Sequence, residues 1–493
     1  MLIPDLLARA ISDHPDREAY VHGDKRATYA WLGRSAGGFA ATLLDLGVER
    51  GDIVVLALGS SIKFAACYLG ALQVGAITSA INLRLGRTEQ RSIFERTEPR
   101  VTVLGDGAEL PAGANPGTVI SVTDLGPIFR ADNPDPARLP RLSPTDPTCI
   151  VWTSGTTGEP KGAVYDHAGQ IAISRNIGEL TAPGDRRLSV LPFAHVGYMT
   201  RMADELDNAT TIVMPGEPWT PAEHLRLVRE EAITMVTGVP TQWQRVLDHP
   251  DLARTDFSGV RVAGLGGASI APELVRRMRD TLGCPVLARY TSTHIGDPDE
   301  VVANTVGRPT PEVEVRLVVD GRTGDQGHDV APGEVGEVTC RSPAMMREYW
   351  KDPERTAEVI DADGFLHTGD LGSFDADGNL RIVGRLKDMY IRGGYNVYPA
   401  EVEGVLSEHP SVARSAVVGI ADTERDLGEI GVAFIVAADE GVAPDLGELK
   451  AWCRAQLADY KAPDRLVVVD DLPVTAMMKV DKRALLARLE EDA

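Results

Sequence analysis

The feature that most constrains the fold is the alternation of short apolar runs with helical patterns in the first 150 residues. Apolar runs span 52–58, 76–81, 101–104 and 119–122. The segment around Leu43, Leu44 and Leu46 and the segment 61–75 have the spacing of helices. Strands that alternate with helices form parallel sheets covered by helices, so we expect an α/β fold.

Composition then limits the number of domains and the classes of function. A chain of 493 residues is too long to fold around a single hydrophobic core, so two or more domains are expected. The net charge of -22 argues against a nucleic-acid or anionic-membrane binder. The N-terminus lacks the pattern of a signal peptide, and no apolar run reaches membrane-spanning length. The five cysteines lack metal-ligand spacing, which indicates free thiols and a cytoplasmic location.

The stretch Thr153–Gly162, Thr-Ser-Gly-Thr-Thr-Gly-Glu-Pro-Lys-Gly, follows the apolar run Cys149–Trp152, which reads as a buried strand. Glycines let the backbone approach a ligand, and exposed N–H groups of such a turn form an anion cradle. Hydroxyl groups and Lys161 suit a polyphosphate. The spacing is not that of a Walker A loop. Taken alone, the stretch also fits a polar hairpin, because Gly, Ser, Thr and Pro favour turns.

Further polar groups lie in turns that follow apolar segments, and each has a structural alternative. His195 follows 189–193 and could be a packed or solvent-facing histidine. Asp370 ends the segment 364–370, where it is expected at a strand end and could form an Asx turn. Arg385 and Lys387 could belong to a basic surface turn, and Lys479 could be one solvated lysine among many. The glycine-rich turns 237–241 and 264–268 could serve tight packing.

Together these motifs resemble the adenylate-forming superfamily, which includes acyl-CoA synthetases, peptide-synthetase adenylation domains and firefly-type luciferases. The matching segments run from Thr153 to Lys482 and include 289–294, 364–370, 380–388, 390–396 and 472–482. The resemblance implies a large N-terminal α/β domain of several subdomains over 1–384. It implies a small mobile α+β domain over 385–493 that carries the catalytic lysine.

The resemblance also implies roles for individual residues. ATP would be bound by Thr153, Ser154, Gly155, Thr156, Thr157, Gly158, Lys161, Gly267, Ala268, Tyr290, Thr291, Ser292, Thr293, Asp370, Ile382, Arg385 and Lys479. The carboxylate substrate would contact His195, Gly197, Tyr198, Gly238 and Gly266. CoA would pass Gly393 and Gly394, and Lys387 would be the hinge. Lys479, Arg385 and His195 would be the catalytic residues.

Two positions depart from the family pattern. His294 stands where the family has a Glu that contacts Mg²⁺, a cation that prefers oxygen ligands. Thr156 is the other metal candidate, and Asp297 or Glu300 could compensate for His294. Met478 stands where the family has Gly, directly before Lys479.

The implied chemistry has two half-reactions with ATP, Mg²⁺ and CoA. A carboxylate attacks the α-phosphate of ATP to give an acyl-adenylate and pyrophosphate, and a thiol then displaces AMP. The alternatives within the superfamily are loading of a carrier protein and activation of nitrite to diazotise an aromatic amine. A nucleotide-binding protein without catalysis is the alternative of a different class. Neither nucleic acid nor membrane insertion is expected.

Overall fold

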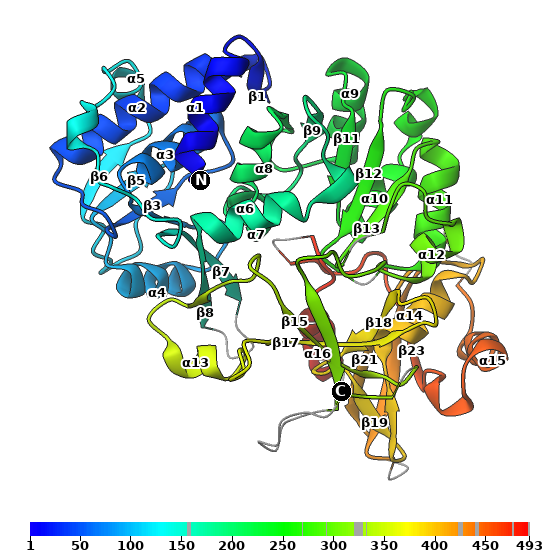
Figure 1. The fold of residues 1–493 in the computed structure, drawn as a ribbon. Coiled ribbons are helices and arrows are strands. Elements are labelled where there is room, and N and C mark those ends of the chain that lie inside the picture. The colour runs from blue at the N-terminus through cyan, green and yellow to red at the C-terminus, as the bar shows by residue number, and fades with distance from the viewer. Residues whose placement is uncertain are drawn as a thin grey trace. The chain divides into compact units, whose positions relative to one another are not determined.

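The computed structural model describes residues 1–154, 159–268, 270–291, 293–319, 329–331, 333–422, 427–438, 443–475 and 478–491. Its contacts divide the chain into two units. Unit 1 comprises Met1–Thr237, Ala253–Arg261 and Arg341–Gly364, and unit 2 comprises Gly238–Leu252, Val262–Cys340 and Phe365–Ala493. The mixed α/β architecture expected from the sequence is confirmed (Figure 1).

Unit 1 contains two sheets with helices packed on them. Its helices are α1 (Ile3–Asp13), α2 (Tyr29–Asp45), α3 (Ile62–Gln73), α4 (Arg87–Thr97), α5 (Leu125–Ile128), α6 (His167–Arg175), α7 (Val196–Met199), α8 (Met202–Asp207), α9 (Pro221–Glu230) and α13 (Pro353–Ala357). Its strands are β1 (Glu18–His22), β2 (Lys25–Thr28), β3 (Ile53–Ala57), β4 (Ile77–Ala80), β5 (Val101–Leu104), β6 (Thr118–Ser121), β7 (Pro147–Ser154), β8 (Pro160–Asp166), β9 (Arg186–Leu188), β10 (Thr211–Met214), β11 (Met235–Gly238) and β16 (Glu348–Tyr349). Short 3-10 turns span Pro136–Arg138, Gly178–Leu180 and Pro250–Arg254.

The predicted alternation is realised in the sheet β16-β8-β7-β4-β3-β5-β6. Strands β4, β3, β5 and β6 pair in parallel, whereas β7 and β8 form an antiparallel hairpin. Within the second sheet, β11, β9, β10, β1 and β2 are successive strands. Helix α3 begins where the Ser61 hydroxyl accepts a hydrogen bond from Phe64 N (3.2 Å), as in a common N-cap.

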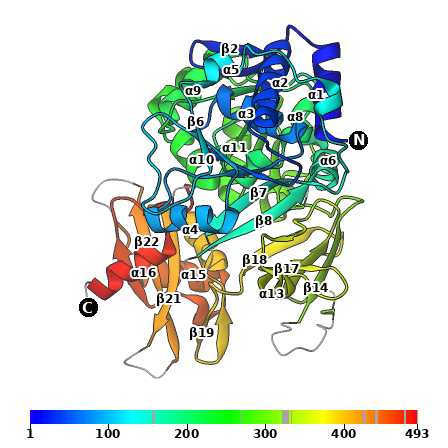
Figure 2. The same ribbon diagram turned by 90° about the vertical axis from the view of Figure 1, so that its left-hand side faces the viewer.

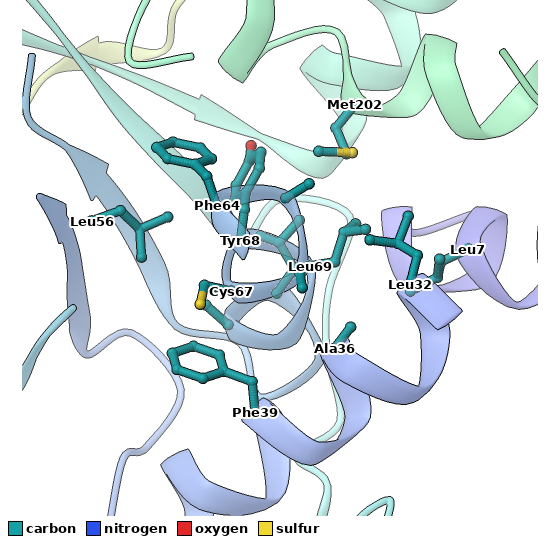
Figure 3. Packing of buried hydrophobic residues seen from close by; sticks show 14 of the residues in the cluster. Leu7, Leu32, Ala36, Phe39, Leu56, Phe64, Cys67, Tyr68, Leu69 and Met202 are labelled. Atoms are coloured by element: carbon teal, nitrogen blue, oxygen red, sulfur yellow. The ribbon is translucent and has the colours of Figure 1, made fainter. Parts of the chain in front are cut away.

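The core of unit 1 lies around α2 and α3, which pack against each other, and α3 also packs against β3 (Figure 3). Phe39, Phe64 and Tyr68 are among its fully buried side chains. Every residue of β3 is buried, as expected for a central parallel strand covered on both faces.

Unit 2 begins with α/β elements and ends in a small α+β part. Its helices are α10 (Pro240–Leu247), α11 (Pro272–Leu282), α12 (Asp299–Asn304), α14 (Pro399–Ser407), α15 (Leu446–Gln456) and α16 (Lys482–Glu491), with a 3-10 turn at Asp459–Lys461. Its strands are β12 (Val262–Gly266), β13 (Val286–Arg289), β14 (Glu314–Val318), β15 (Gly336–Arg341), β17 (Leu366–Phe374), β18 (Leu380–Arg385), β19 (Tyr390–Arg392), β20 (Tyr395–Val397), β21 (Val412–Ala421), β22 (Glu429–Ala437) and β23 (Arg465–Val468). Strands β12 and β13 pair in parallel, and β14-β15-β17-β18 form a sheet.

The C-terminal part, residues 390–491, is built on the sheet β21-β22-β23 (Figure 2). Alternate residues of β22 face opposite sides: Ala433 and Ile435 pack against α14 and α15, and Val432 and Phe434 pack against α16. Burial on both faces explains why β22 reads as a continuous apolar run.

A tyrosine docks the hairpin β19–β20 onto this sheet. Gly419 and Gly431 are paired across β21 and β22, and the Tyr390 ring lies over both. A Cβ at Gly431 would stand 2.2 Å from the Tyr390 hydroxyl, and one at Gly419 would stand 2.4 Å from Tyr390 Cβ. The ring therefore occupies a slot that only two glycines leave open. Beside it, Arg392 makes a two-pronged ion pair with Asp464 at 2.7 and 2.9 Å.

The described cysteines are free thiols, as predicted, and four of the five are buried. Within the described residues, the structure has no helix that is long and apolar enough to cross a bilayer.

Candidate active site

An ion pair between neighbouring strands forms the centre of the site. The antiparallel register of β17 and β18 sets Asp370 opposite Arg385, and Arg385 Nε donates to Asp370 Oδ1 at 2.7 Å. The carboxylate is buried, whereas 53% of the Arg385 side chain is exposed. The arginine can therefore turn its other N–H groups toward an anion while Asp370 holds it.

Asp370 lies within β17 and not at a strand end, so that part of the sequence prediction is wrong. Thr339 pairs with His367 and Glu337 pairs with Leu371, so one residue of β15, Val338, lies opposite three residues of β17. Gly369 has φ +70°, a left-handed conformation that favours glycine. Such a bulge re-aims the side chain of the residue beside it.

Three side chains that sequence reasoning did not select hold this bulge together. The Thr368 hydroxyl donates to a β15 carbonyl at 2.6 Å and accepts from Asp370 N and from the Tyr290 hydroxyl. Glu337 accepts from Gly369 N at 3.0 Å and is 2.9 Å from His367 Nδ1. In the sequence, these side chains could have been suspected only from His367 and Thr368, which directly precede Gly369 in the motif 364–370.

Tyr290, an expected ATP contact, is brought to the same place. Its hydroxyl donates to Thr368 Oγ1 at 3.2 Å. Desolvation of the hydroxyl end and, to a smaller degree, the Asp370 carboxylate raise the pKa of the Tyr290 phenol, although 41% of the residue as a whole is exposed. The phenol thus stays protonated at neutral pH and acts as a hydrogen-bond donor.

Lys479 reaches the same cluster from a tight turn. Thr475 N donates to Lys479 O at 2.8 Å, and Met478 N donates to Thr475 O at 2.9 Å. A Cβ built on Gly267 would stand 3.9 Å from Lys479 Cε, so the lysine stem passes close to that backbone. Burial lowers the pKa of the Lys479 ammonium, Arg385 and Lys387 lower it further, and Asp370 opposes them.

The turn explains why Met478 is an unusual residue at its position. Met478 has φ +58°, in the left-handed region. The hydrogen bonds of Thr475, Met478 and Lys479 close a tight turn, and a left-handed position in such a turn is typical of glycine. A non-glycine residue there costs on the order of 1–2 kcal/mol. Ala476 and Met477 lie outside the described residues.

The predicted backbone contacts of unit 2 lie at the ends of β11, β12 and β13. A Cβ at Gly266 would stand 2.9 Å from the Arg289 carbonyl oxygen, and one at Gly238 would stand 3.1 Å from Trp243 Nε1. Tight packing therefore suffices to explain both glycines. Gly267 and Ala268 follow Gly266 and are exposed. Their predicted contacts with ATP or substrate stay predictions.

The hydroxyls after β13 hold their own loop. Thr291 donates to the Val306 carbonyl, and Thr293 is buried and accepts from Ala288 N at 2.9 Å. Ser292 lies outside the described residues. Ile382, on β18, packs against the cluster that contains Val338.

The predicted phosphate loop joins β7 and β8 in unit 1. Gly155, Thr156, Thr157 and Gly158 lie outside the described residues, as does the side chain of Ser154. Thr153 pairs with Lys161 across the hairpin, and the Lys161 ammonium stands 5.3 Å from the centre of the Tyr349 ring. The loop therefore joins two firmly paired strands.

The predicted substrate segment of unit 1 is a short helical turn that begins at His195. Gly197 N donates to His195 Nδ1 at 3.0 Å, so the proton of the neutral ring sits on Nε2. A Cβ at Gly197 would stand 3.1 Å from His195 Nδ1. Tyr198 is 1% exposed, stacks on Phe193 with 3.5 Å between ring centres, and shares a hydrogen bond with Tyr20. Tyr198 thus supports the segment from the core.

The remaining predicted residues lie in turns of unit 2. Lys387 is exposed in the turn between β18 and β19. Gly393 and Gly394 form the β19–β20 turn with φ +57° and +82°, which requires glycine or a residue tolerant of strain. His294 is exposed, and its backbone N–H donates to Asp297 at 2.7 Å.

The described residues do not form a metal site. They contain no group of three His, Cys, Asp or Glu side chains able to hold an ion. Asp297 is engaged by His294 N, and Glu300 forms an ion pair with Arg276 at 3.2 Å. Each carboxylate thus has a partner within the protein, and a role of Asp297 or Glu300 in place of the family's glutamate stays a prediction.

Two family models match the chain. AMP-binding enzyme matches residues 7–350, and AMP-binding enzyme C-terminal domain matches 401–479. The chain is similar to the 3-[(3aS,4S,7aS)-7a-methyl-1,5-dioxo-octahydro-1H-inden-4-yl]propanoyl:CoA ligase of Rhodococcus jostii (strain RHA1), at 36% identity over 98% of each chain. It is similar to the feruloyl-CoA synthase of Amycolatopsis sp, at 34% identity over 95% of each. Its fold is similar to that of ATP-bound MatB from Rhodopseudomonas palustris, with a TM-score of 0.87 and 28% identity over 99% of each chain.

Proposed function

Because the chain belongs to the AMP-binding enzyme family, of the acyl-CoA synthetase-like, adenylate-forming kind, we propose that the cluster around Lys479 is where it joins a carboxylate to AMP. The enzyme is an AMP-forming acid–thiol ligase, which activates a carboxylic acid with ATP and transfers the acyl group to CoA.

The observation that supports this site is an excess of positive charge in an acidic protein. The net charge is -22, yet Arg385 and Lys387 lie near enough to Lys479 to lower the pKa of its ammonium, while the Asp370 carboxylate acts in the opposite direction. The first step joins two anions, so fixed positive charge near the forming bond stabilises the transition state most.

In the first step a carboxylate oxygen attacks the α-phosphorus of ATP, and the bond to pyrophosphate breaks. Lys479 bridges the carboxylate and the α-phosphate, and Arg385 contacts phosphate or ribose. Asp370 accepts from the ribose hydroxyls while it orients Arg385. The N–H groups of Thr153 to Gly158 and Lys161 hold the departing pyrophosphate, and Gly267, Ala268 and the 290–293 segment border the adenine.

In the second step the thiol of CoA loses its proton to solvent, its sulfur attacks the acyl carbon, and AMP leaves with the electrons of the broken acyl–oxygen bond. The N-terminal domain of the proposed mechanism covers 1–384 and the C-terminal domain covers 385–493, which is a different division from units 1 and 2. A rotation about Lys387 exchanges Lys479 for the Gly393–Gly394 turn. The exposed position of Lys387 between β18 and β19 supports the hinge. The absence of side chains at 393 and 394 suits a narrow passage for the pantetheine arm.

The substrate is a ring-bearing carboxylic acid with a short acyl chain, bordered by the His195–Tyr198 segment. The names of the two curated relatives support this class, since one is an indenyl-propanoyl:CoA ligase and the other a feruloyl-CoA synthase. Mg²⁺ is the metal of the reaction, with Thr156 and His294 as the candidate residues at its site.

The test is pyrophosphate release with ATP and Mg²⁺ over a panel of ring-bearing and aliphatic acids, each with and without CoA. We expect release that depends on one class of acid, with a CoA thioester as product. Lys479→Ala should lower adenylation by about a hundredfold or more while ATP binding is kept. Lys351→Ala is the control, since Lys351 forms an exposed ion pair with Glu98.

Three outcomes would contradict the proposal. Adenylation by Lys479→Ala at a near-normal rate would remove Lys479 from the reaction. Release only with nitrite and an aminoaryl acid would indicate diazotisation chemistry. ATP binding without pyrophosphate release for any acid of the panel would indicate a carrier-dependent enzyme or a nucleotide-binding protein without catalysis.

A further inference from the structure

Helix α10 carries two side chains that hold the turn of Lys479, and neither has a catalytic role of its own. Thr241 and Arg245 are four residues apart, so they lie on the same face of the helix. The Thr241 hydroxyl donates to the carbonyl oxygen of Met478. Arg245 Nη2 forms an ion pair with Asp471 Oδ2 at 2.9 Å. We propose that α10 is a two-point anchor that positions Lys479 for adenylation.

The helix is itself firmly held, as an anchor must be. Gln242 accepts from Val239 N at 3.1 Å, which caps the first turn of α10. Trp243 is 1% exposed, and its indole N–H donates to the Gly264 carbonyl at 3.1 Å. These contacts fix α10 to β12, which leads directly to Gly267 beside the Lys479 stem.

The first contact acts on the peptide group next to Lys479. A peptide unit is planar, so fixing the Met478 carbonyl also fixes the orientation of Lys479 N. The turn behind it is closed by Thr475 N to Lys479 O at 2.8 Å and by Asp481 N to Pro473 O at 2.8 Å. Displacing the carbonyl therefore moves Lys479 together with the turn.

The second contact ties the same chain segment to the C-terminal sheet. Asp471 Oδ1 pairs with Arg414 of β21, while Oδ2 pairs with Arg245. One carboxylate thus links α10 to β21. The Asp471 side chain is 52% exposed, so the link is open to solvent and can be broken and remade at low cost.

This inference rests on the proposed function, in which Lys479 serves adenylation and is withdrawn for the thiol step. The anchors stabilise only the arrangement in which Lys479 is engaged. Removing either one should slow adenylation and leave transfer from a preformed acyl-adenylate to CoA unchanged or faster. A purely structural role would lower both half-reactions together.

The experiment compares Thr241→Val, which keeps the shape and removes the hydroxyl, with Arg245→Gln. Acid-dependent ATP–pyrophosphate exchange measures the first half-reaction, and CoA thioester formation from a synthetic acyl-adenylate measures the second. In the first half-reaction we expect Thr241→Val to lose about fivefold, as for a lost hydrogen bond, and Arg245→Gln to lose about twofold to fivefold, as for an exposed ion pair. Neither variant should lose rate in the second half-reaction. Arg245→Lys should restore the rate of ATP–pyrophosphate exchange, because lysine can still pair with Asp471. Arg87→Gln is the control, because Arg87 pairs with Glu109 in unit 1.

Hydrogen–deuterium exchange of the backbone amides at Leu472, Val474, Thr475 and 478–481 is a readout that needs no catalysis. We expect faster exchange of these amides in Thr241→Val and in Arg245→Gln. Exchange should be unchanged in Arg245→Lys and in the control Arg87→Gln. Equal losses in both half-reactions, or unchanged exchange at these amides, would overturn the anchor. A wild-type enzyme that forms no adenylate would contradict the proposed function, while the amide measurement would still decide the anchor.

Discussion

At the scale of single residues, the site depends on a lysine whose charge is costly to keep. Burial and the cations Arg385 and Lys387 lower the pKa of the Lys479 ammonium, and the Asp370 carboxylate raises it. An ammonium that is poorly compensated in the free enzyme is ready to pair with two anions. The substrates therefore supply the counter-charge that the protein leaves out.

The pKa shift predicts an alkaline limit on adenylation. The protonated lysine is the active form and its folded pKa is lowered, so kcat/KM for the acid should fall as the pH rises through a value below 10.5. In Lys479→Arg this limb should disappear, because a guanidinium stays charged over the whole range. The measurement is the pH profile of pyrophosphate exchange, and an identical limb in both enzymes would contradict the assignment.

Residue positions were predictable from sequence where a local motif fixes them, and unpredictable where distant segments meet. Asp370 and Arg385 are fifteen residues apart on adjacent strands, and the structure joins them. The bulge at Gly369 depends on the pairing of β15 with β17, which no local pattern reveals. Thr241 meets Met478 across 237 residues of sequence, so only the fold could show its role.

At the scale of elements, the pattern of apolar residues in the sequence predicted many of the strands and helices of unit 1. The runs at 52–58, 76–81 and 101–104 became β3, β4 and β5 because they are buried on both faces. The segment 61–75 became α3, which ends at Gln73, two residues short of Gly75. Gly75 has φ +70° and terminates the helical segment, as glycine commonly does.

The slot for Tyr390 predicts that alanine has opposite effects on the free energy of unfolding at two glycines of neighbouring elements. Gly431→Ala should destabilise the protein by about 1–3 kcal/mol, because the new Cβ would overlap the Tyr390 hydroxyl at 2.2 Å. Gly404→Ala should stabilise it by about 0.5–1 kcal/mol, because Gly404 lies within α14 with no neighbour inside 4 Å. Urea unfolding of both variants tests the pair, and equal effects would show that the slot is not tight.

At the scale of the whole molecule, two buried histidines make stability depend on pH. Burial lowers the pKa of His167 to about 4 and that of His224 to about 4, against an ordinary value of 6.5. Below pH 6.5 the unfolded chain binds protons that the folded chain excludes. Their contribution to stability is therefore complete above pH 6.5 and is lost as the pH falls toward 4.

Between pH 7.5 and pH 5 we expect a loss of about 2 kcal/mol for each histidine in the free energy of unfolding. Urea unfolding at the two pH values measures it. His224→Gln should be less stable at pH 7.5 and should show a smaller loss on acidification, since glutamine does not titrate. An unchanged pH dependence would mean that the ring is protonated within the fold.

The slot that Tyr390 fills also restricts how such enzymes can be recombined. Tyr390, Gly419 and Gly431 come from three strands, yet the aromatic ring packs in place only if both other positions are glycine. A chimera that exchanges the β19–β20 hairpin without β21 and β22 would bring an unfitted ring against new side chains, or leave an empty groove. For protein engineering, the exchangeable module is therefore the hairpin together with its sheet.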